Sequence, residues 1–223
     1  MRVVLAHEGD DAAYALVQRW TGRALLVTAS QIAARHLSLR QRGADVRSWM
    51  PGTTIDAVVT RLSGVSPDEL PHVSSEDRSY AAEEMTAFLV AWLDTCPGRV
   101  VNRPSPGCLN GPPWRPAQWL RAAARLGLRV RSLQWAVGPP GRCERPGPPG
   151  PEGCVVTVVC GRWFGECHPV LGTQAVGLAR ATGTDMLEVV FDNDVPGAAV
   201  VMASAWPDVA NPEVADALDE YLG

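Results

Sequence analysis

The sequence contains no lysine, because all twenty basic residues among its 223 are arginine. A mechanism that needs a lysine, either as a Schiff base or as a compact ammonium on a phosphate, is therefore excluded. The chain also lacks any run of about 20 apolar residues, so we expect no membrane span. Its short N-terminal apolar run soon meets acidic residues, which indicates no secretory signal.

A strong positive charge is also missing. Acidic residues outnumber basic ones, and the formal net charge is −4 at pH 7. Because the arginines are scattered among acids, we expect no basic stripe of the kind that nucleic acid requires, and no nucleic-acid partner. The length and the 46% apolar content predict a globular protein of one compact domain or two small ones.

The six cysteines show none of the spacings of about two to four residues that are typical of zinc sites. We predict reduced thiols, mostly packed in the core of a cytoplasmic protein, with no metal and no cofactor. An alternative places a metal ion at Cys160, Cys167 and His168. The cysteines are Cys96, Cys108, Cys143, Cys154, Cys160 and Cys167.

The first half of the chain alternates short apolar runs with helix-compatible stretches. This alternation predicts a parallel sheet with right-handed crossovers. The clearest helix, at 74–94, has a broad apolar face that includes Tyr80, Phe88 and Trp92. The predicted strands are 2–6, 24–28, 44–49, 55–61, 99–102 and 128–137, and the predicted helices are 10–21, 30–42, 74–94 and 115–127.

One segment, 138–153, contains eleven Pro or Gly among its sixteen residues. Proline prevents a helix or a central strand, so we predict a loop or a semi-extended connector there. A hairpin centred on Gly161 and further elements follow, and we expect them to pack against the first half. These elements are the hairpin 154–170, helices at 172–182 and 212–222, and strands at 185–192 and 198–205; the predicted domains are 1–136 and 154–223, joined by a linker at 137–153.

The stretches 55–70 and 74–130 resemble the N-terminal, substrate-side domain of ATP-grasp ligases of the peptide-maturase kind. In that family an arginine-bearing strand, a long helix starting near a tyrosine, an N-R/P-P-S strand end and a Q-L-x-x-A-x-x-x-G helix occur in this order. Their counterparts in this sequence are Arg61, Tyr80, the stretch from Asn102 to Ser105 and the stretch from Gln118 to Gly127, with Trp119 in place of the leucine.

The segment after the connector resembles the end of the same family, with 155–168 similar to its hairpin and 200–222 similar to its last strand and helix. Two departures matter. The family carries a whole nucleotide-binding domain with a lysine where this chain has only the connector. The resemblance also places Met202 and Ser204 where the family has the Glu and Asn that hold magnesium, and a thioether is a poor ligand for that cation.

The resemblance implies an α/β fold with an N-terminal parallel-sheet, pre-ATP-grasp-like domain and a small C-terminal α+β segment. It also implies a truncated, non-catalytic pseudoenzyme of peptide natural-product biosynthesis, which binds a precursor peptide or a partner enzyme and forms a homodimer. Two alternatives stay open: a lysine-free enzyme that uses a cleft between the two halves for non-ATP chemistry, and an unrelated α/β protein with a proline-rich loop. The candidate peptide- or ligand-binding residues are Arg61, Asn102, Arg103, Ser105, Trp114 and Trp206.

Overall fold

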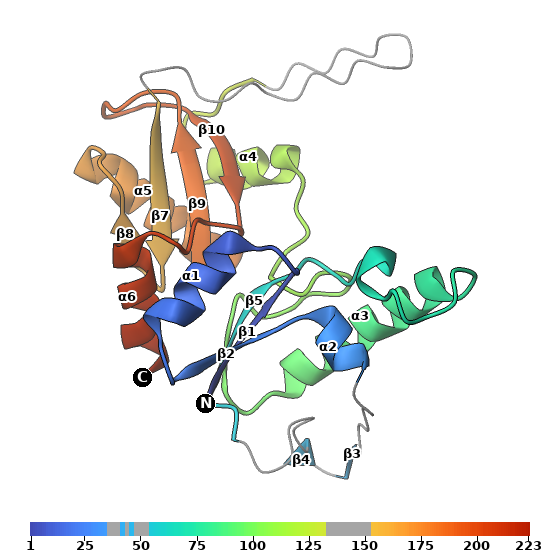
Figure 1. Ribbon diagram of the computed structural model, residues 1–223. Helices are drawn as coiled ribbons and strands as arrows, with labels where there is room; N and C mark the ends of the chain where they lie inside the picture. Colours follow the sequence, from blue (N-terminus) through green and yellow to red (C-terminus); the bar gives the residue numbers. More distant parts are fainter. Residues whose placement is uncertain (35–40, 43–44, 47–53, 133–152) are drawn as a thin grey trace, which may run out of the picture. The chain divides into compact units, whose positions relative to one another are not determined.

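The computed structural model describes residues 1–34, 41–42, 45–46, 54–132 and 153–223 of the chain (Figure 1). These residues form two compact units. The first unit comprises Met1–Pro113 and Asp208–Gly223, and the second comprises Trp114–Pro207. The predicted linker, apart from Gly153, lies outside the described residues.

The first unit contains a four-stranded parallel sheet in the order β2-β1-β5-β6. Every residue of β1 and β5 is buried, as expected for central strands of a sheet that helices cover on both faces. The parallel α/β architecture predicted from the alternating pattern is therefore confirmed. The strands are β1 (Arg2–Ala6), β2 (Ala24–Val27), β5 (Ala57–Arg61) and β6 (Arg99–Val101).

Helices α1 and α2 of the first unit begin at capping side chains. Asp10 accepts a hydrogen bond from the amide of Ala13, and Thr28 forms a capping box with Gln31. The helix predicted at 30–42 ends at Ala33 as far as the described residues go. The helices are α1 (Asp11–Arg19), α2 (Ala29–Ala33), the short 3-10 helix η1 (Pro67–Glu69), α3 (Arg78–Thr95) and α6 (Pro212–Leu222).

Helix α3 starts four residues later than predicted, because residues 74–77 form a turn in which the hydroxyl of Ser74 donates to Asp77. Its core-facing side chains include Met85, Leu89 and Trp92. Tyr80 was predicted to lie on this apolar face, but it is 67% exposed. A short antiparallel pair follows α2, in which β4 (Asp45–Val46) lies within the strand predicted at 44–49, whereas β3 (Gln41–Arg42) lies at the end of the helix predicted at 30–42.

The second unit contains an antiparallel sheet in the order β10-β9-β7-β8. The predicted hairpin is present, and Cys160 and Gly161 form its two-residue turn, both with positive φ as a type I′ turn requires. Of the strand predicted at 128–137, the described residues form only a bridge from Val130 to Val200. The strands are β7 (Cys154–Val159), β8 (Arg162–Phe164), β9 (Met186–Phe191) and β10 (Val200–Ser204).

Two helices pack on one face of this sheet, α4 (Pro116–Arg125) and α5 (Pro169–Thr182). The units differ from the predicted domains in two elements. Helix α4 was predicted with the first half, but its buried residues belong to the core of the second unit. Helix α6 was predicted with the C-terminal segment, but it belongs to the first unit, where Arg2 and Arg19 bond to it.

No helix among the residues that the structure describes is long and apolar enough to span a membrane.

Candidate functional site

The carboxyl edge of the parallel sheet is where an open α/β fold is expected to bind ligands. In the order β2-β1-β5-β6, β2 lies on one side of β1, and the later strands β5 and β6 lie on the other side. Ligands of open α/β sheets lie beyond the carboxyl ends of the strands at the point where the strand order changes side, here between β1 and β5. His7 follows β1, Arg61 ends β5 and Asn102 follows β6. The fold therefore brings two of the predicted site residues, Arg61 and Asn102, to the same edge.

Arg61 is held in a buried ion pair. Its Nε donates to Oδ2 of Asp10 at 2.7 Å, and the two side chains are only 8% and 11% exposed. The other oxygen of Asp10 caps α1 through the amide of Ala13. This pair fixes the first helix to the end of β5, and it leaves the guanidinium buried within the fold rather than presented to solvent.

A second polar pair at this edge was missed by sequence reasoning. Nδ1 of His7 lies 2.9 Å from Oε1 of Glu69, while Oε2 of Glu69 accepts the amide of Ser66 at 2.9 Å. The spacing of Ser66 and Glu69 is a capping-box signature that the sequence does carry. No sequence signal joins His7 to Glu69, since they are 62 residues apart. A carboxylate that orients an imidazole is an arrangement that can transfer a proton.

The loop after β6 is held by hydrogen bonds among its own residues. Asn102 is buried and adopts a positive φ of 53°, and the hydroxyl of Ser105 donates to the carbonyl of Gly111 at 2.7 Å. Ser105 and Cys108 also exchange backbone hydrogen bonds. Arg103, by contrast, is exposed and donates to the carbonyl of Asp94 at 3.4 Å. Asn102 and Ser105 therefore maintain the loop, whereas Arg103 lies at the surface.

An open groove of about 450 Å³ separates this loop from α3. The residues that line the groove are small and mostly apolar, and Asp94 is the acidic residue among them. The lining residues are Ala87, Val90, Ala91, Asp94, Pro104, Pro106 and Gly107.

In the second unit, the register of the antiparallel sheet decides which side chains share a face. Val189 of β9 lies opposite Val156 and Ala203, and this face packs against α4 and α5. Glu188 lies opposite Thr157 and Ser204, on the other face. Sequence reasoning did not single out Glu188, although the register places it beside Ser204.

The two positions expected to have lost a metal ligand lie on β10. Met202 is 40% exposed, and the hydroxyl of Ser204 accepts the amide of Trp206 at 3.1 Å. A hydroxyl engaged by the backbone two residues away is a local turn motif. Trp206 itself is half-buried. The chemistry of a thioether and a single hydroxyl suits magnesium poorly, because that cation prefers carboxylate and amide oxygens.

The alternative metal site at Cys160, Cys167 and His168 is wrong. Within the described ranges, no group of three or more His, Cys, Asp or Glu side chains is arranged to hold a metal ion. The physical reason is the hairpin, which places Cys160 in its turn while Cys167 and His168 precede α5. His168 instead caps that helix, since its Nδ1 accepts the amide of Val170 at 3.2 Å.

Two cysteines of the second unit, Cys154 and Cys167, are weak nucleophiles. Burial, which is the largest cause, and the neighbouring Cys167 and Asp194 together raise the pKa of the Cys154 thiol to about 11. Burial and Asp194 also raise the pKa of Cys167. Since the thiolate is the reactive form, the raised pKa values make both thiols poorer nucleophiles at neutral pH than an ordinary cysteine. Cys143 lies outside the described residues.

Trp114 lies directly before α4 and contacts the core of the second unit. Its ring meets that of Trp119 edge to face, with the centroids 4.8 Å apart and an interplanar angle of 60°. Trp119 is buried, and Trp114 is partly exposed. Trp114 is thus anchored by one edge and open to solvent on part of its surface.

Comparison with known proteins gives a result at the level of structure alone. No protein-family model matches the sequence, and no curated protein matches it. Among solved structures, the macrocyclase MdnC from Microcystis aeruginosa MRC, bound with the precursor peptide MdnA, matches 100% of this chain and 99% of its own, at a TM-score of 0.70 and 11% identity.

Two further structures show the same likeness. The ATP-grasp ligase PsnB, complexed with a minimal precursor, Mg and ADP, matches 99% of this chain and 98% of its own, at a TM-score of 0.66 and 15% identity. A RiPP-associated ATP-grasp ligase from Chryseobacterium gregarium, in complex with ADP and a leader and core peptide, matches 99% and 96%, at a TM-score of 0.66 and 9% identity. The chain therefore has an ATP-grasp-like fold, as the sequence resemblance implied.

Proposed function

Because the chain has the fold of ligases that act on ribosomally made peptides, we propose that it is a peptide-binding accessory protein of peptide natural-product biosynthesis, without ligase activity of its own. It binds a precursor peptide or a partner enzyme in that pathway. Solved neighbours of this fold include complexes with precursor peptides, which supports the peptide as ligand.

The observation that carries the proposal is the pair of side chains on β10. Met202 offers a thioether, and the hydroxyl of Ser204 is engaged by the amide of Trp206. Neither group supplies the carboxylate or amide oxygen that magnesium prefers. Glu188, opposite Ser204, is a single carboxylate, and one carboxylate makes a weak site.

The absence of lysine supports the same proposal. Phosphate groups are commonly held by lysine as a compact point charge, and this chain has none in its whole sequence. The connector at 138–153 is also too short to be a domain, since a domain needs about 50 residues. We propose that this connector stands in place of the nucleotide-binding domain of the ligases.

We further propose a homodimer. The apolar face of α3 does not supply the contact, because Met85, Leu89 and Trp92 lie in the core of the first unit. The exposed side of the same helix, which carries Tyr80, Ala87 and Ala91, remains a candidate surface. Light scattering of the purified protein at tens of micromolar measures its mass in solution. A strictly monomeric mass contradicts the homodimer proposal.

The proposed function is tested with the purified chain and the peptides encoded by short reading frames beside its gene. Calorimetry should detect binding of one such peptide without nucleotide, and intact-mass analysis after incubation with Mg and ATP should find the peptide unchanged. A peptide that loses water in the presence of ATP contradicts the proposal. The failure of every encoded peptide to bind rules out the peptide as ligand and leaves only the partner enzyme.

A second candidate function is favoured by His7 and Glu69. A carboxylate-oriented imidazole at the carboxyl edge of the sheet suits a proton-transfer enzyme that does not use ATP. Under this candidate, His7→Gln abolishes turnover while leaving peptide binding intact. Under the accessory-protein proposal, there is no turnover to lose, and His7→Gln leaves peptide binding unchanged.

A further inference from the structure

Cys154 and Cys167 belong to one region of the second unit. Cys154 is the first residue of β7, and Cys167 lies two residues before α5. Cys154 is part of the buried core of the unit, and Cys167 packs against the same core. Both are free thiols. The proposed function uses neither of them, so their chemistry is a separate question.

The register of the β7–β8 hairpin brings the two cysteines toward each other. In this antiparallel pair, Thr157 lies opposite Phe164, the last residue of β8. Continued by three positions, the same register sets Cys154 opposite Cys167. The chain stays against β7 beyond the end of β8, because a Cβ at Gly165 would lie 2.4 Å from a carbonyl oxygen of that strand. Opposed residues of antiparallel chains have Cα atoms about 4.5–5.5 Å apart, which is within the range of a disulfide.

The loop after β9 bonds to both cysteine segments. The thiol of Cys154 donates to the carbonyl of Asn193 at 3.5 Å. The next residue, Asp194, accepts the backbone amide of His168, which adjoins Cys167. Two consecutive residues of one loop therefore contact the two segments, so these segments are close together by evidence that does not depend on the hairpin register.

Cys160 is too far away to compete for Cys154. It lies in the hairpin turn at the other end of β7, six residues along the chain. At about 3.3 Å per residue of strand, the two Cα atoms are about 20 Å apart, whereas a disulfide needs a Cα separation below about 7 Å. The fold therefore favours Cys154 with Cys167, although Cys160 is nearer to both in sequence.

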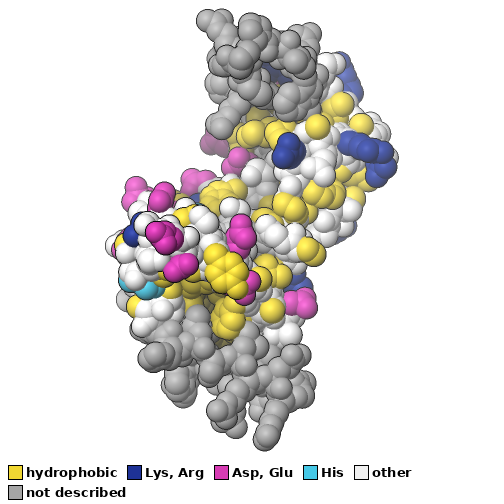
Figure 2. All heavy atoms as spheres, turned by 90° about the vertical axis from the view of Figure 1, so that its right-hand side faces the viewer, with side chains coloured by type: hydrophobic (Ala, Val, Ile, Leu, Met, Phe, Trp, Pro, Cys, Tyr) yellow, Lys and Arg dark blue, Asp and Glu magenta, His cyan; other side chains and the backbone are white. Residues whose placement is uncertain are grey.

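The two thiols differ in their access to solvent. Hydrophobic side chains reach the surface on the face that Figure 2 shows, but Cys154 is covered, with only 8% of the residue exposed. Cys167 is half-buried. A reagent from solution therefore reaches Cys167 first, and Cys154 can only react afterwards, from within the core.

The surroundings of the pair disfavour charge. Burial, with Asp194 beside both cysteines, raises the pKa values of the two thiols, so few thiolates form at neutral pH and thiol exchange is slow. A disulfide carries no charge. The burial and the carboxylate that oppose two thiolates therefore do not oppose the oxidised pair.

We propose that Cys154 and Cys167 form a disulfide by exchange with a low-molecular-weight disulfide, of which glutathione disulfide is the probe used below. The Cys167 thiolate attacks one sulfur of glutathione disulfide, whose S–S bond breaks and releases one glutathione thiolate. The Cys154 thiolate then attacks Sγ of Cys167 in this mixed disulfide and releases the second. The two cysteines are oxidised, glutathione disulfide is reduced to two glutathione molecules, and the two cysteine protons pass to these through water. The product joins β7 to the start of α5, and it goes beyond the proposed function because no peptide takes part.

The test incubates the purified, fully reduced chain with millimolar glutathione disulfide at about pH 8.5, where thiolates are more abundant. Mass spectrometry of the intact chain, and of its fragments after proteolysis without reductant, identifies adducts and crosslinks. The variant Cys154→Ala removes the second thiol of the exchange. The control Cys160→Asn removes a thiol of the same unit and keeps a residue that tolerates the positive φ of 49° in the turn. Circular dichroism checks that both variants are folded.

We expect the unmodified chain and Cys160→Asn to lose two hydrogens and to give a fragment that links Cys154 with Cys167. This crosslink should exceed any other by at least about tenfold, because the other described thiols are out of reach. In Cys154→Ala, glutathione should remain attached to Cys167. The thermal midpoint of the oxidised unmodified chain should rise by about 4–12 °C, since a disulfide constrains the unfolded state, and reductant should reverse the rise.

Several results overturn the proposal. They are a chain that stays fully reduced, glutathione that remains on Cys167 of the unmodified chain, a main crosslink to Cys143 or Cys160, and a midpoint that does not rise. Treatment in urea above the unfolding transition gives the last comparison. Short loops close more easily in an unfolded chain, so pairs with Cys160 should then prevail. The same selective link between Cys154 and Cys167 in urea would show that the fold does not cause it.

Discussion

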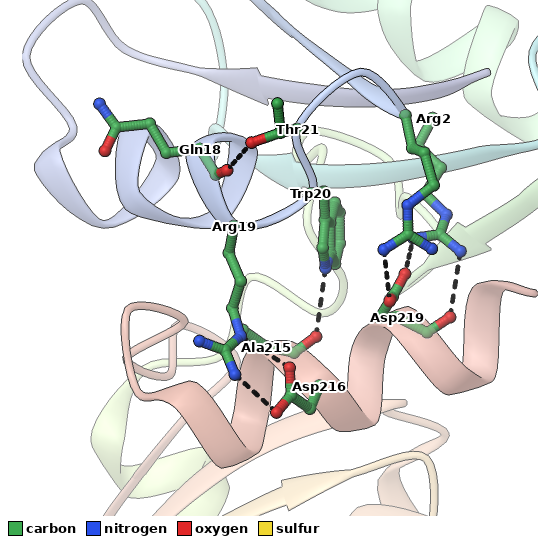
Figure 3. Close-up of polar contacts among 9 residues, drawn as sticks. Arg2, Gln18, Arg19, Trp20, Thr21, Ala215, Asp216 and Asp219 are labelled. Atoms are coloured by element: carbon green, nitrogen blue, oxygen red, sulfur yellow. Dashed lines mark hydrogen bonds and ion pairs between the residues drawn. The ribbon is translucent and has the colours of Figure 1, made fainter.

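Asp219, near the end of the last helix, bonds to the buried guanidinium of Arg2 in the first strand (Figure 3). Arg2 also donates to the backbone carbonyl of Asp219 at 3.1 Å and lies over the ring of Trp20 at 5.1 Å. Arg23 donates to the second carboxylate oxygen at 2.8 Å. The two ends of the chain are thus joined within the first unit, which explains why α6 belongs there.

The first prediction concerns this junction. Asp219→Asn removes the carboxylate and leaves the guanidinium of Arg2, whose side chain is 6% exposed, without its counter-charge. We expect a loss of about 3 kcal/mol in the free energy of unfolding, the lower end of the range for a buried pair that loses one partner, since Asp219 itself is a quarter exposed. Urea denaturation measures it.

The matched control for that prediction is Asp216→Asn on the same helix. Asp216 pairs with Arg19 through two hydrogen bonds of 2.6 and 2.7 Å, but it is 62% exposed. An exposed pair is worth little, so the control should leave the urea midpoint nearly unchanged. Equal losses of unfolding free energy in the two variants would show that the unpaired guanidinium of Arg2 does not cause the destabilisation.

The second prediction is the pH dependence of the same junction. Burial alone would raise the pKa of Asp219, but hydrogen bonds from Arg2 and Arg23 outweigh it, and the pKa lies below its ordinary value of 3.8. A lowered pKa means that the folded state gains stability above about pH 4 and loses it as the pH falls through the folded pKa. The difference in unfolding free energy between the unmodified chain and Asp219→Asn should be constant from neutral pH to about 4 and shrink below it. A difference that grows on acidification contradicts this assignment.

The third prediction compares two glycines of α5. A Cβ at Gly172 would lie 2.3 Å from the ring of Trp163, whereas a Cβ at Gly177 would meet nothing within 4 Å. Gly172→Ala should therefore destabilise the protein by about 1–3 kcal/mol through overpacking. Gly177→Ala should stabilise it by about 0.5–1 kcal/mol, because alanine favours a helix interior. In thermal unfolding, the midpoint should fall for Gly172→Ala and rise for Gly177→Ala, each relative to the unmodified chain.

The fourth prediction concerns the two aromatic residues of α3. Trp92 is 3% exposed in the core, and Tyr80 is 67% exposed. Trp92→Ala should lower the unfolding free energy by about 3–5 kcal/mol. Tyr80→Ala should change it by less than about 0.5 kcal/mol. A stable Trp92→Ala protein that only changes its oligomeric state would place Trp92 at an interface instead.

The predictable parts of the fold are those that depend on the pattern of apolar and turn-forming residues within a short stretch of sequence. The apolar runs at 2–6 and 55–61 became β1 and β5, and the Cys160-Gly161 turn of the hairpin follows from a glycine between two apolar stretches. Helix 212–222 was also predicted with its correct bounds. In each case neighbouring residues alone decide the conformation.

Partners far apart in sequence were not predictable. Arg2 and Asp219 are 217 residues apart, and nothing near either residue points to the other. The same holds for His7 with Glu69, and for Glu188, whose position beside Ser204 depends on the register of three strands. The direction of Arg121 and Arg125 was hidden for another reason, since only the burial of Trp119 and Leu120 shows that these two arginines point to solvent.

The central claim is tested most directly by thermal unfolding of the purified chain with millimolar ATP and magnesium. We predict no change in the midpoint, because Met202 and Ser204 supply no suitable metal ligand and the chain has no lysine. A nucleotide bound at 100 times its dissociation constant would stabilise the protein by about 2.7 kcal/mol, which corresponds to a rise of about 5–10 °C for a chain of this size. A rise of that magnitude would contradict the claim that this protein binds its peptide without being a ligase.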